Sequence, residues 1–308
     1  MNFKECFENN KVILMEGAVG ERLKNEYNIY PDKQVALAGL IYRDDNKVAL
    51  KKIYSQYVEI GLKYGYPVML TTPTRRANRY NVKCSDYGKN IIRDNMEFLL
   101  DVKSNYTHPI YIGGLMGCKG DAYKATEILS EAKAYEFHSW QAKLFREAKA
   151  DYLFAGIMPA LTEAVGMAIA MEETGLPYII SFMIRDNGRL IDGTPISEAI
   201  EVIDKATRRN PICYMTNCVH PNTLYKALNC SFNQVPAVIK RFCGIQANAS
   251  PMTPEELESG REIIVSDYME LADGMIRLHQ EYNLKILGGC CGTDHIYMEE
   301  VAKGLNNR

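Results

Sequence analysis

The sequence has no excess of basic residues and contains no long apolar run. Its formal net charge is −2 and its isoelectric point is about 6.3, so it lacks the basic surface that binding to a phosphate backbone requires. We therefore expect no nucleic-acid partner. Residues 1–17, MNFKECFENNKVILMEG, have neither the cationic flank and apolar core of a signal peptide nor the roughly 20 apolar residues of a membrane span. We expect a soluble, cytoplasmic protein that does not enter a membrane.

The sequence also lacks domain linkers. It has no low-complexity tract, no connecting segment rich in proline, glycine or serine, and no internal repeat beyond an alternation of apolar and amphipathic stretches. With 308 residues, of which 47% are hydrophobic, it can bury one large core. We expect residues 1–308 to form a single domain.

Eight short apolar runs recur along the chain, with amphipathic stretches between them. Such runs are typical of parallel strands that are covered on both faces. Eight strand–helix units in about 250 residues are what a (β/α)8 barrel, or TIM barrel, requires; an open, doubly wound sheet is the alternative. The predicted strands are residues 12–15, 67–70, 110–112, 152–155, 178–184, 212–215, 241–245 and 285–288. We expect residues 16–66 to add a loop or helix over one barrel mouth, and residues 253–266 to be a smaller insertion.

Two amphipathic stretches have a residue suited to begin a helix. Residues 197–209 have Ser197 as a candidate N-cap, and residues 293–305 have Thr293 or Asp294. Side chains of Ser, Thr and Asp accept hydrogen bonds from the free N–H groups of a first helical turn. We therefore expect helices to begin at these residues.

Nine cysteines in a chain without a secretory signal indicate reduced thiols, some of which can bind metal. Chemistry in a barrel lies at the C-terminal ends of the strands. Cys218 follows the sixth predicted strand, and Cys290 and Cys291 follow the eighth, so their loops can bring three sulfurs to one point. Three thiolates suit Zn²⁺, which in catalytic sites keeps a fourth tetrahedral position for water or substrate.

Glycines flank the adjacent pair of cysteines. Gly288, Gly289 and Gly292 would let the backbone turn sharply, so that neighbouring side chains face one ion. The alternative for the three cysteines is that they are small buried hydrophobic residues. None of the five histidines has the spacing of a metal ligand. We assign the packing role to the other cysteines, which are Cys6, Cys84, Cys118, Cys213, Cys230 and Cys243.

Three motifs together resemble a known family. They are GGCCGT at residues 288–293, NC at residues 217–218 and EGAVGERL at residues 16–23. In this combination the sequence resembles the homocysteine S-methyltransferase family, which includes betaine-homocysteine methyltransferase and the homocysteine module of methionine synthases. The resemblance covers nearly the whole chain. It implies a (β/α)8 barrel and zinc ligation by Cys218, Cys290 and Cys291.

The resemblance also implies a role for Glu16. The family usually has an aspartate at this place, which helps to hold the amino group of homocysteine, and Glu16 keeps the charge. The alternative is a solvated loop carboxylate. Weaker candidates for substrate contacts at the mouth are Thr72, Asn217, Asn248, Arg75 and Arg76. Local turn formation is the alternative for the two asparagines, and an exposed surface position is the alternative for the two arginines.

One position departs from the family pattern. Members that use homocysteine generally have a glutamate after the fourth strand as a second anchor for the amino group. In this chain that segment reads LFAGIMPALTEA, and Gly156 stands at the corresponding place. Glu163 follows on the next predicted helix, and we do not expect it to replace the missing anchor.

These features predict a zinc-dependent thiol S-methyltransferase. Zn²⁺ held by three thiolates would bind a thiol in its fourth position as the thiolate, which makes it a nucleophile without a dedicated base. We expect homocysteine, converted to methionine, as the acceptor. Two alternatives remain open: a different thiol, which Gly156 allows, and a non-catalytic zinc-binding protein.

The methyl donor is not determined by these motifs. The given sequence has no second barrel for a folate and no DxHxxG cobalamin signature, so we do not expect a complete cobalamin-type methionine synthase. A small activated donor such as S-methylmethionine, S-adenosylmethionine or betaine suits a single domain. Delivery of the methyl group by a separate corrinoid protein is the alternative.

Overall fold

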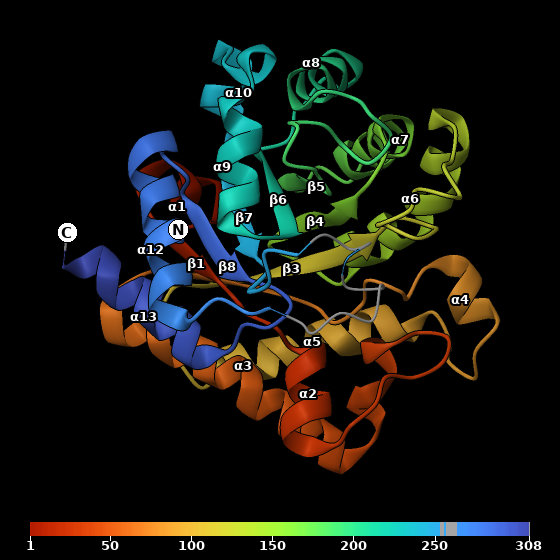
Figure 1. Cartoon of the computed structure of the whole chain (residues 1–308). Helices are drawn as coiled ribbons and strands as arrows, with labels where there is room; N and C mark the ends of the chain where they lie inside the picture. The colour runs from red at the N-terminus through yellow and green to blue at the C-terminus, as the bar shows by residue number, and fades with distance from the viewer. Residues whose placement is uncertain (253–255, 257–263, 308) are drawn as a thin grey trace.

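A computed structural model describes residues 1–252, 256 and 264–307. Eight parallel strands form a closed barrel in chain order, and helices surround it (Figure 1). Each predicted strand is present, so the prediction of a TIM barrel is confirmed and the open sheet is wrong. The strands are β1 (Ile13–Met15), β2 (Val68–Thr71), β3 (Ile110–Gly117), β4 (Tyr152–Met158), β5 (Tyr178–Phe182), β6 (Cys213–Val219), β7 (Phe242–Ala247) and β8 (Ile286–Gly289).

The barrel closes between its first and last strands. Ile13 of β1 pairs with Ile286 of β8, and Leu14 pairs with Leu287, in parallel register. Closure leaves no strand edge with free backbone groups. It also places the loops that follow β6 and β8 in one ring, as the prediction for the cysteines requires.

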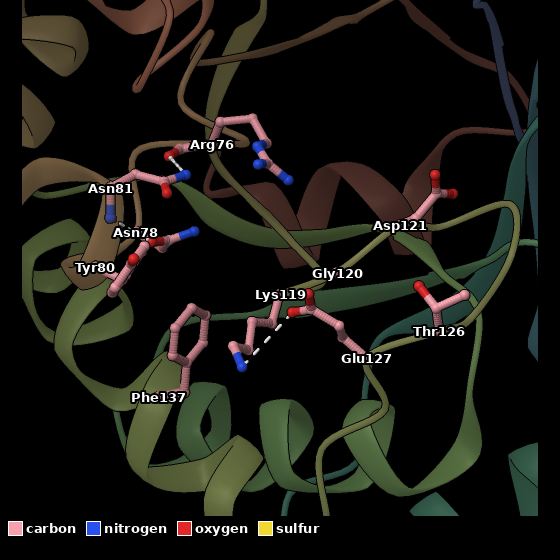
Figure 2. Close-up of a pocket in the computed structure, with 10 residues that line it drawn as sticks. All are labelled: Arg76, Asn78, Tyr80, Asn81, Lys119, Gly120, Asp121, Thr126, Glu127 and Phe137. Atoms are coloured by element: carbon pink, nitrogen blue, oxygen red, sulfur yellow. Dashed lines mark hydrogen bonds and ion pairs between the residues drawn. The ribbon is translucent and has the colours of Figure 1, made fainter. Parts of the chain in front are cut away.

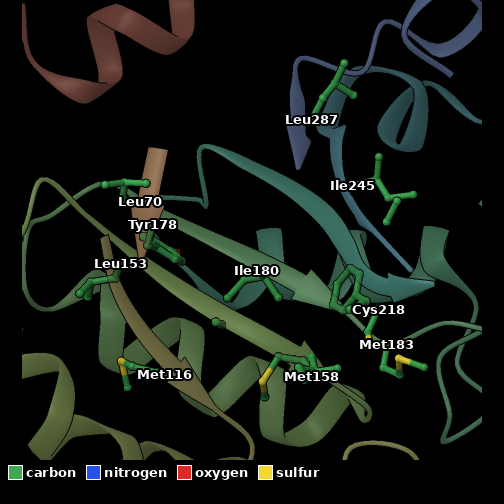
Figure 3. Packing of buried hydrophobic residues seen from close by; sticks show 14 of the residues in the cluster. Leu70, Met116, Leu153, Met158, Tyr178, Ile180, Met183, Cys218, Ile245 and Leu287 are labelled. Atoms are coloured by element: carbon green, nitrogen blue, oxygen red, sulfur yellow. The ribbon is translucent and has the colours of Figure 1, made fainter. Parts of the chain in front are cut away.

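Alternate residues of the strands pack on the two sides of the barrel wall. Leu70 and Ile180 belong to a buried cluster that joins the strands to the surrounding helices (Figure 3). Their chain neighbours Met69 and Ile179 belong to a second cluster, as the two-residue period of a strand requires. Phe3, from the N-terminal helix, also belongs to this second cluster. Packing therefore fills the barrel from its N-terminal end and leaves the opposite end for a site.

The helices follow the strands as predicted, with one wrong start. Asp294 is the N-cap of the last helix and accepts a hydrogen bond from Tyr297 N at 3.0 Å, which confirms one of the two candidates. Ser197 is not a cap, because its helix begins at Ile196 and Pro195 takes the cap position. The helices are α1 (Phe3–Asn9), α2 (Gly20–Tyr27), η1 (Leu37–Tyr42), α3 (Asp44–Tyr64), α4 (Arg79–Lys83), α5 (Asn90–Ser104), α6 (Glu131–Glu147), α7 (Leu161–Glu172), α8 (Ile196–Ala206), α9 (Pro221–Asn229), η2 (Ser231–Asn233), α10 (Pro236–Arg241), α12 (Tyr268–Tyr282) and α13 (His295–Asn306).

The two predicted insertions have different outcomes. Residues 16–66 contribute α2, η1 and α3, and Leu37 of this segment lines the pocket at the barrel mouth, so the prediction is confirmed. Most of the second segment, residues 253–255 and 257–263, lies outside the described residues.

No described helix is both long and apolar enough to cross a membrane.

Two strand ends at the barrel mouth are irregular. The pairing of β4 with β5 shifts its register around Ile157, and the pairing of β6 with β7 shifts around Cys218. Both residues have positive φ angles, 54° for Ile157 and 63° for Cys218, which is uncommon for residues other than glycine. A bulge breaks the alternation of side chains, so the neighbours Asn217 and Cys218 both line the same pocket.

Candidate metal centre and substrate pocket

The structure brings the three predicted cysteines together. The Sγ atom of Cys218 lies 3.5 Å from that of Cys291, and the Sγ atoms of Cys290 and Cys291 are 4.0 Å apart. All three sulfurs lie within 4.8 Å of one another. Cys218 is buried, Cys290 is half-buried and Cys291 is exposed. Three sulfurs at this spacing, open to solvent on one side, fit a tetrahedral metal that keeps one exchangeable position.

Backbone contacts hold the loop after β8 in place. Cys290 N donates to Ala247 O at 2.7 Å, and Ala249 N donates to Cys291 O at 2.9 Å, so the end of β7 holds both cysteines. Gly292 has a φ of 74°, a conformation that favours glycine. A Cβ atom on Gly289 would lie 2.2 Å from Thr293 Oγ1. Gly292 therefore allows the turn because it can adopt a positive φ, and Gly289 allows it because it has no side chain to block the approach of Thr293.

Neighbouring groups favour the thiolate at Cys218. Hydrogen bonds from the thiols of Cys290 and Cys291, together with one from Tyr123, lower the pKa of Cys218 well below its usual range. Hydrogen bonding to Cys218 raises the pKa of Cys290. The cluster therefore holds its first negative charge on the buried sulfur, and a cation is needed before all three sulfurs can ionise.

Tyr123 contacts the cluster, and sequence reasoning missed it. Its hydroxyl lies 3.0 Å from Cys218 Sγ. Burial raises the pKa of Tyr123, so the hydroxyl stays protonated and donates to the thiolate. The residue lies in the loop between β3 and α6, and with 20 tyrosines in the chain no local pattern distinguishes it.

A pocket of about 270 Å³ opens beside the three sulfurs. Four of the six candidate substrate contacts, Glu16, Thr72, Arg75 and Asn217, line it. Asn248 does not line it, but its Nδ2 lies 4.0 Å from Cys218 Sγ. Besides the three cysteines, the other lining residues are Gly17, Ala18, Val19, Gly20, Glu21, Leu37, Tyr54, Thr71, Pro73, Leu115, Tyr123, Ile157, Gln246 and Gly289.

Glu16 is buried in this pocket rather than solvated. One carboxylate oxygen accepts hydrogen bonds from the backbone N–H of Thr71, at 3.1 Å, and from the Thr71 hydroxyl. The other oxygen, Oε2, is buried and has no partner. Burial raises the pKa of Glu16 to about 7. A buried carboxylate oxygen without a partner costs free energy, and a cationic group bound in the pocket would remove that cost.

Asn217 and Thr72 shape the pocket through internal hydrogen bonds. Asn217 Oδ1 accepts from Ile157 N at 3.0 Å and from Ser181 Oγ at 2.6 Å, so it joins the end of β6 to the irregular end of β4. The Thr72 hydroxyl accepts from Leu115 N at 3.1 Å and lies 2.7 Å from Thr74 Oγ1. Both polar groups are engaged in holding the wall.

The family model described as homocysteine S-methyltransferase matches residues 13–305. The chain belongs to the homocysteine S-methyltransferase family. A curated relative, the homocysteine S-methyltransferase YbgG of Bacillus subtilis (strain 168), is 27% identical over 187 residues, which cover 59% of this chain and 56% of YbgG. The match thus spans a little over half the length of that relative.

Solved structures support the same fold. The metallated form of the Escherichia coli homocysteine methyltransferase MmuM has a TM-score of 0.77 at 17% identity, over 97% of this chain and 98% of that chain. The oxidised form of MmuM has a TM-score of 0.78 at 16% identity, over 96% and 97%. At this level of identity the likeness shows the fold, a (β/α)8 barrel over nearly the whole chain.

At the place of the second amino-group anchor expected from the family, the chain has a glycine. Gly156 does not line it, and a Cβ atom there would lie 2.9 Å from Leu115 Cδ1. Glu163 is not a replacement, because it is buried on α7, where Oε1 accepts from Lys119 N at 2.7 Å and lies 3.0 Å from His138 Nε2. Neither Gly156 nor Glu163 therefore provides the carboxylate that the family pattern predicts after the fourth strand.

The cysteines outside the cluster, to which we assigned a packing role, differ in burial. Cys6, Cys118 and Cys213 are buried, in agreement with the prediction. Cys84 is exposed, so the prediction is wrong for this residue, which ends the short helix α4 at the surface.

Proposed function

We propose that this chain is a zinc-dependent thiol S-methyltransferase that converts homocysteine to methionine. The observation that carries the proposal is the meeting of two features in one pocket. Three sulfurs lie within 4.8 Å of one another, and the free oxygen of Glu16 is buried beside them without a partner. The first suits a thiol-binding metal and the second suits an ammonium group.

The protein's own residues would divide the work as follows. Cys218, Cys290 and Cys291 would hold Zn²⁺, which when bound favours the thiolate form of an entering thiol at neutral pH. Tyr123 stabilises the negative charge of Cys218 through its hydroxyl. Glu16 pairs with the α-ammonium of homocysteine and so orients the chain that leads to its sulfur.

A small, activated methyl donor suits the size of the pocket. S-methylmethionine, S-adenosylmethionine and betaine each carry the methyl group on a cationic atom, and a negatively charged metal–thiolate cluster attracts such a cation. A separate corrinoid protein is the alternative donor. We also propose that residues 1–308 act as one domain and that the protein works in the cytoplasm, where thiols stay reduced.

A different acceptor thiol is the second candidate function, and Gly156 is the observation that favours it. A non-catalytic zinc site is the third hypothesis. It requires a closed set of four protein ligands, whereas the candidate cluster within the described part of the chain has three.

A screen of methyl donors against acceptor thiols tests the proposal. The zinc-loaded, reduced protein is incubated with each pair, and the methylated product is measured by mass spectrometry, with Cys218→Ala as the control. We expect methionine from homocysteine with at least one donor. If zinc-loaded protein methylates no thiol with any donor, and its zinc has four protein ligands by X-ray absorption, the proposal is wrong.

A further inference from the structure

Two adjacent arginines at the barrel mouth have no partner for their charge. Arg75 and Arg76 lie in the loop between β2 and α4, and both are half-buried. Neither guanidinium makes a hydrogen bond or an ion pair with another residue in the part of the chain that the structure describes. A half-buried guanidinium without a counterion loses part of its hydration, and an anion that binds to it would compensate for that loss.

The two arginines line different cavities. Arg75 lines the pocket that contains the three cysteines and Glu16. Arg76 lines a separate cavity of about 420 Å³, where Lys119 forms an ion pair with Glu127 at 3.6 Å (Figure 2). The pair therefore offers a natural comparison, because only Arg75 faces the proposed site of reaction.

Arg75 passes beside the place where the family anchor is missing. A Cβ atom on Gly117 would lie 2.6 Å from Arg75 Cγ, so the stem of the arginine lies directly on the end of β3. Gly117 is the register partner of Gly156 in β4. Gly117 thus makes room for the arginine, and the neighbouring strand has no carboxylate at residue 156, where the family pattern predicts one.

The charges of the pocket are separated. Arg75 and Glu16 line the same pocket but form no ion pair with each other, and the free oxygen of Glu16 has no partner at all. The second lining carboxylate, Glu21, accepts a hydrogen bond from Gly292 N at 2.5 Å. Arg75 is therefore available to an anionic group that enters from outside.

We propose that Arg75 binds the carboxylate of one of the two substrates. Arg75 thereby makes the pocket specific for an acidic group, whereas Glu16 makes it specific for a cationic one. A guanidinium binds a carboxylate through two parallel hydrogen bonds, which an ammonium or amide cannot reproduce. The inference rests on the proposed function for the identity of the reaction. The carboxylate belongs either to the acceptor thiol or to the methyl donor.

Three thiols that share the three carbons next to sulfur distinguish the contributions of the two charged groups of the acceptor. Homocysteine carries both charged groups, 4-mercaptobutanoate keeps only the carboxylate, and 3-aminopropane-1-thiol keeps only the amine. Their binding to zinc-loaded, reduced protein is measured by isothermal titration calorimetry without any methyl donor. We expect Arg75→Gln to weaken binding of the two acids by about tenfold or more and to leave the amine within about twofold. Arg76→Gln, the matched control, should leave all three unchanged.

A second arm tests the donor as the source of the carboxylate. Methyl transfer to a fixed thiol is measured with dimethylsulfoniopropionate and with ethyldimethylsulfonium, which lacks the acid. If Arg75→Gln leaves thiol binding unchanged and raises KM only for dimethylsulfoniopropionate, the carboxylate that pairs with Arg75 belongs to the donor. The inference then stands. Arg75→Lys, which keeps the charge, should fall between wild type and Arg75→Gln, and circular dichroism checks that each variant folds.

Two results would overturn the inference. One is that Arg75→Gln changes the binding of no acid, thiol or donor. The other is that it weakens 3-aminopropane-1-thiol as much as 4-mercaptobutanoate. Thiol binding is measured without methyl transfer, so the two proposals can fail separately. If the protein methylates no thiol but still binds thiol acids in a way that depends on Arg75, the proposed function is wrong and this inference stands.

Discussion

Thr71 donates two hydrogen bonds to the same oxygen of Glu16, one from its backbone N–H and one from its hydroxyl. The second oxygen is left buried and without a partner. The carboxylate is therefore held firmly at one oxygen and free at the other, in a pocket shared with three sulfurs. Burial raises its pKa from 4.5 to about 7, which makes its charge state sensitive to pH near neutrality.

Glu16→Gln should stabilise the metal-free protein at high pH relative to wild type. The folded-state pKa lies above the unfolded value, so the stability that protonated Glu16 contributes is complete below pH 4.5 and is lost as the pH rises through 7. The shift corresponds to at most about 3 kcal/mol. Urea unfolding at pH 5 and pH 8 measures the difference between the two proteins, which should grow with pH. The exposed Glu281→Gln is the control, and a difference that stays constant with pH would contradict the raised pKa.

Replacing any of Cys218, Cys290 or Cys291 by alanine should remove most of the zinc affinity and the activity. Two thiolates make a poor zinc site, whereas the barrel core does not depend on the metal, so the fold should persist. Elemental analysis after dialysis measures the bound zinc. Cys84→Ala, at an exposed cysteine away from the cluster, should bind zinc like wild type. Full zinc occupancy in one of the three variants would remove that residue from the ligand set.

Tyr123→Phe should weaken zinc binding without removing it. The hydroxyl lies 3.0 Å from Cys218 Sγ and stabilises the thiolate, and loss of such a supporting hydrogen bond typically costs about ten- to a hundredfold in metal affinity or activity. Competition with a chromogenic chelator measures the affinity. Tyr135→Phe is the matched control, because its hydroxyl bonds only to Glu173 at the surface. Equal zinc affinities for Tyr123→Phe and wild type would show that the contact has no role in the metal site.

Gly156→Glu should shift the preference of the pocket from acidic toward basic thiols. The new side chain would start one strand away from Gly117, against which Arg75 packs. A carboxylate that reaches the guanidinium from there would pair with it, so the affinity ratio of 3-aminopropane-1-thiol to 4-mercaptobutanoate should rise by about tenfold. Leu115 must move, because its Cδ1 lies 2.9 Å from the position of the added Cβ. Gly156→Gln has the same size without the charge and should keep the wild-type ratio. Equal ratios in the two variants would sink the prediction.

Mild peroxide should reversibly abolish the ability of the metal-free protein to bind zinc. Cys218 and Cys291 have the shorter Sγ separation, 3.5 Å against 4.0 Å for the adjacent pair Cys290 and Cys291. We expect a disulfide between Cys218 and Cys291, with peroxide reduced to water as the two thiols lose two electrons and two protons. Peptide mapping by mass spectrometry identifies the bridge, and dithiothreitol should restore zinc binding. Unchanged thiols after peroxide treatment would mean that the sulfurs are protected.

Much of the fold could be predicted from local patterns. The eight apolar runs become eight strands because a strand buried on both faces needs apolar residues throughout, and the barrel follows from their number and their alternation with helices. Asp294 could be recognised as a helix cap from its side chain alone. Ser197 could not be excluded in the same way, because its side chain also suits a cap, and only the structure shows that the helix already begins at Ile196.

The sequence by itself also identified Cys218, Cys290 and Cys291, since thiols after two barrel strands must meet at the same mouth. Only the tertiary structure decided what surrounds them. Whether Glu16 is solvated or buried, whether Arg75 finds a counterion, and which tyrosine reaches Cys218 all depend on side chains that are distant in sequence and meet when the barrel closes. The physical reason is that periodicity reports which face of an element is covered, whereas charge pairing and desolvation depend on which groups from other strands lie opposite.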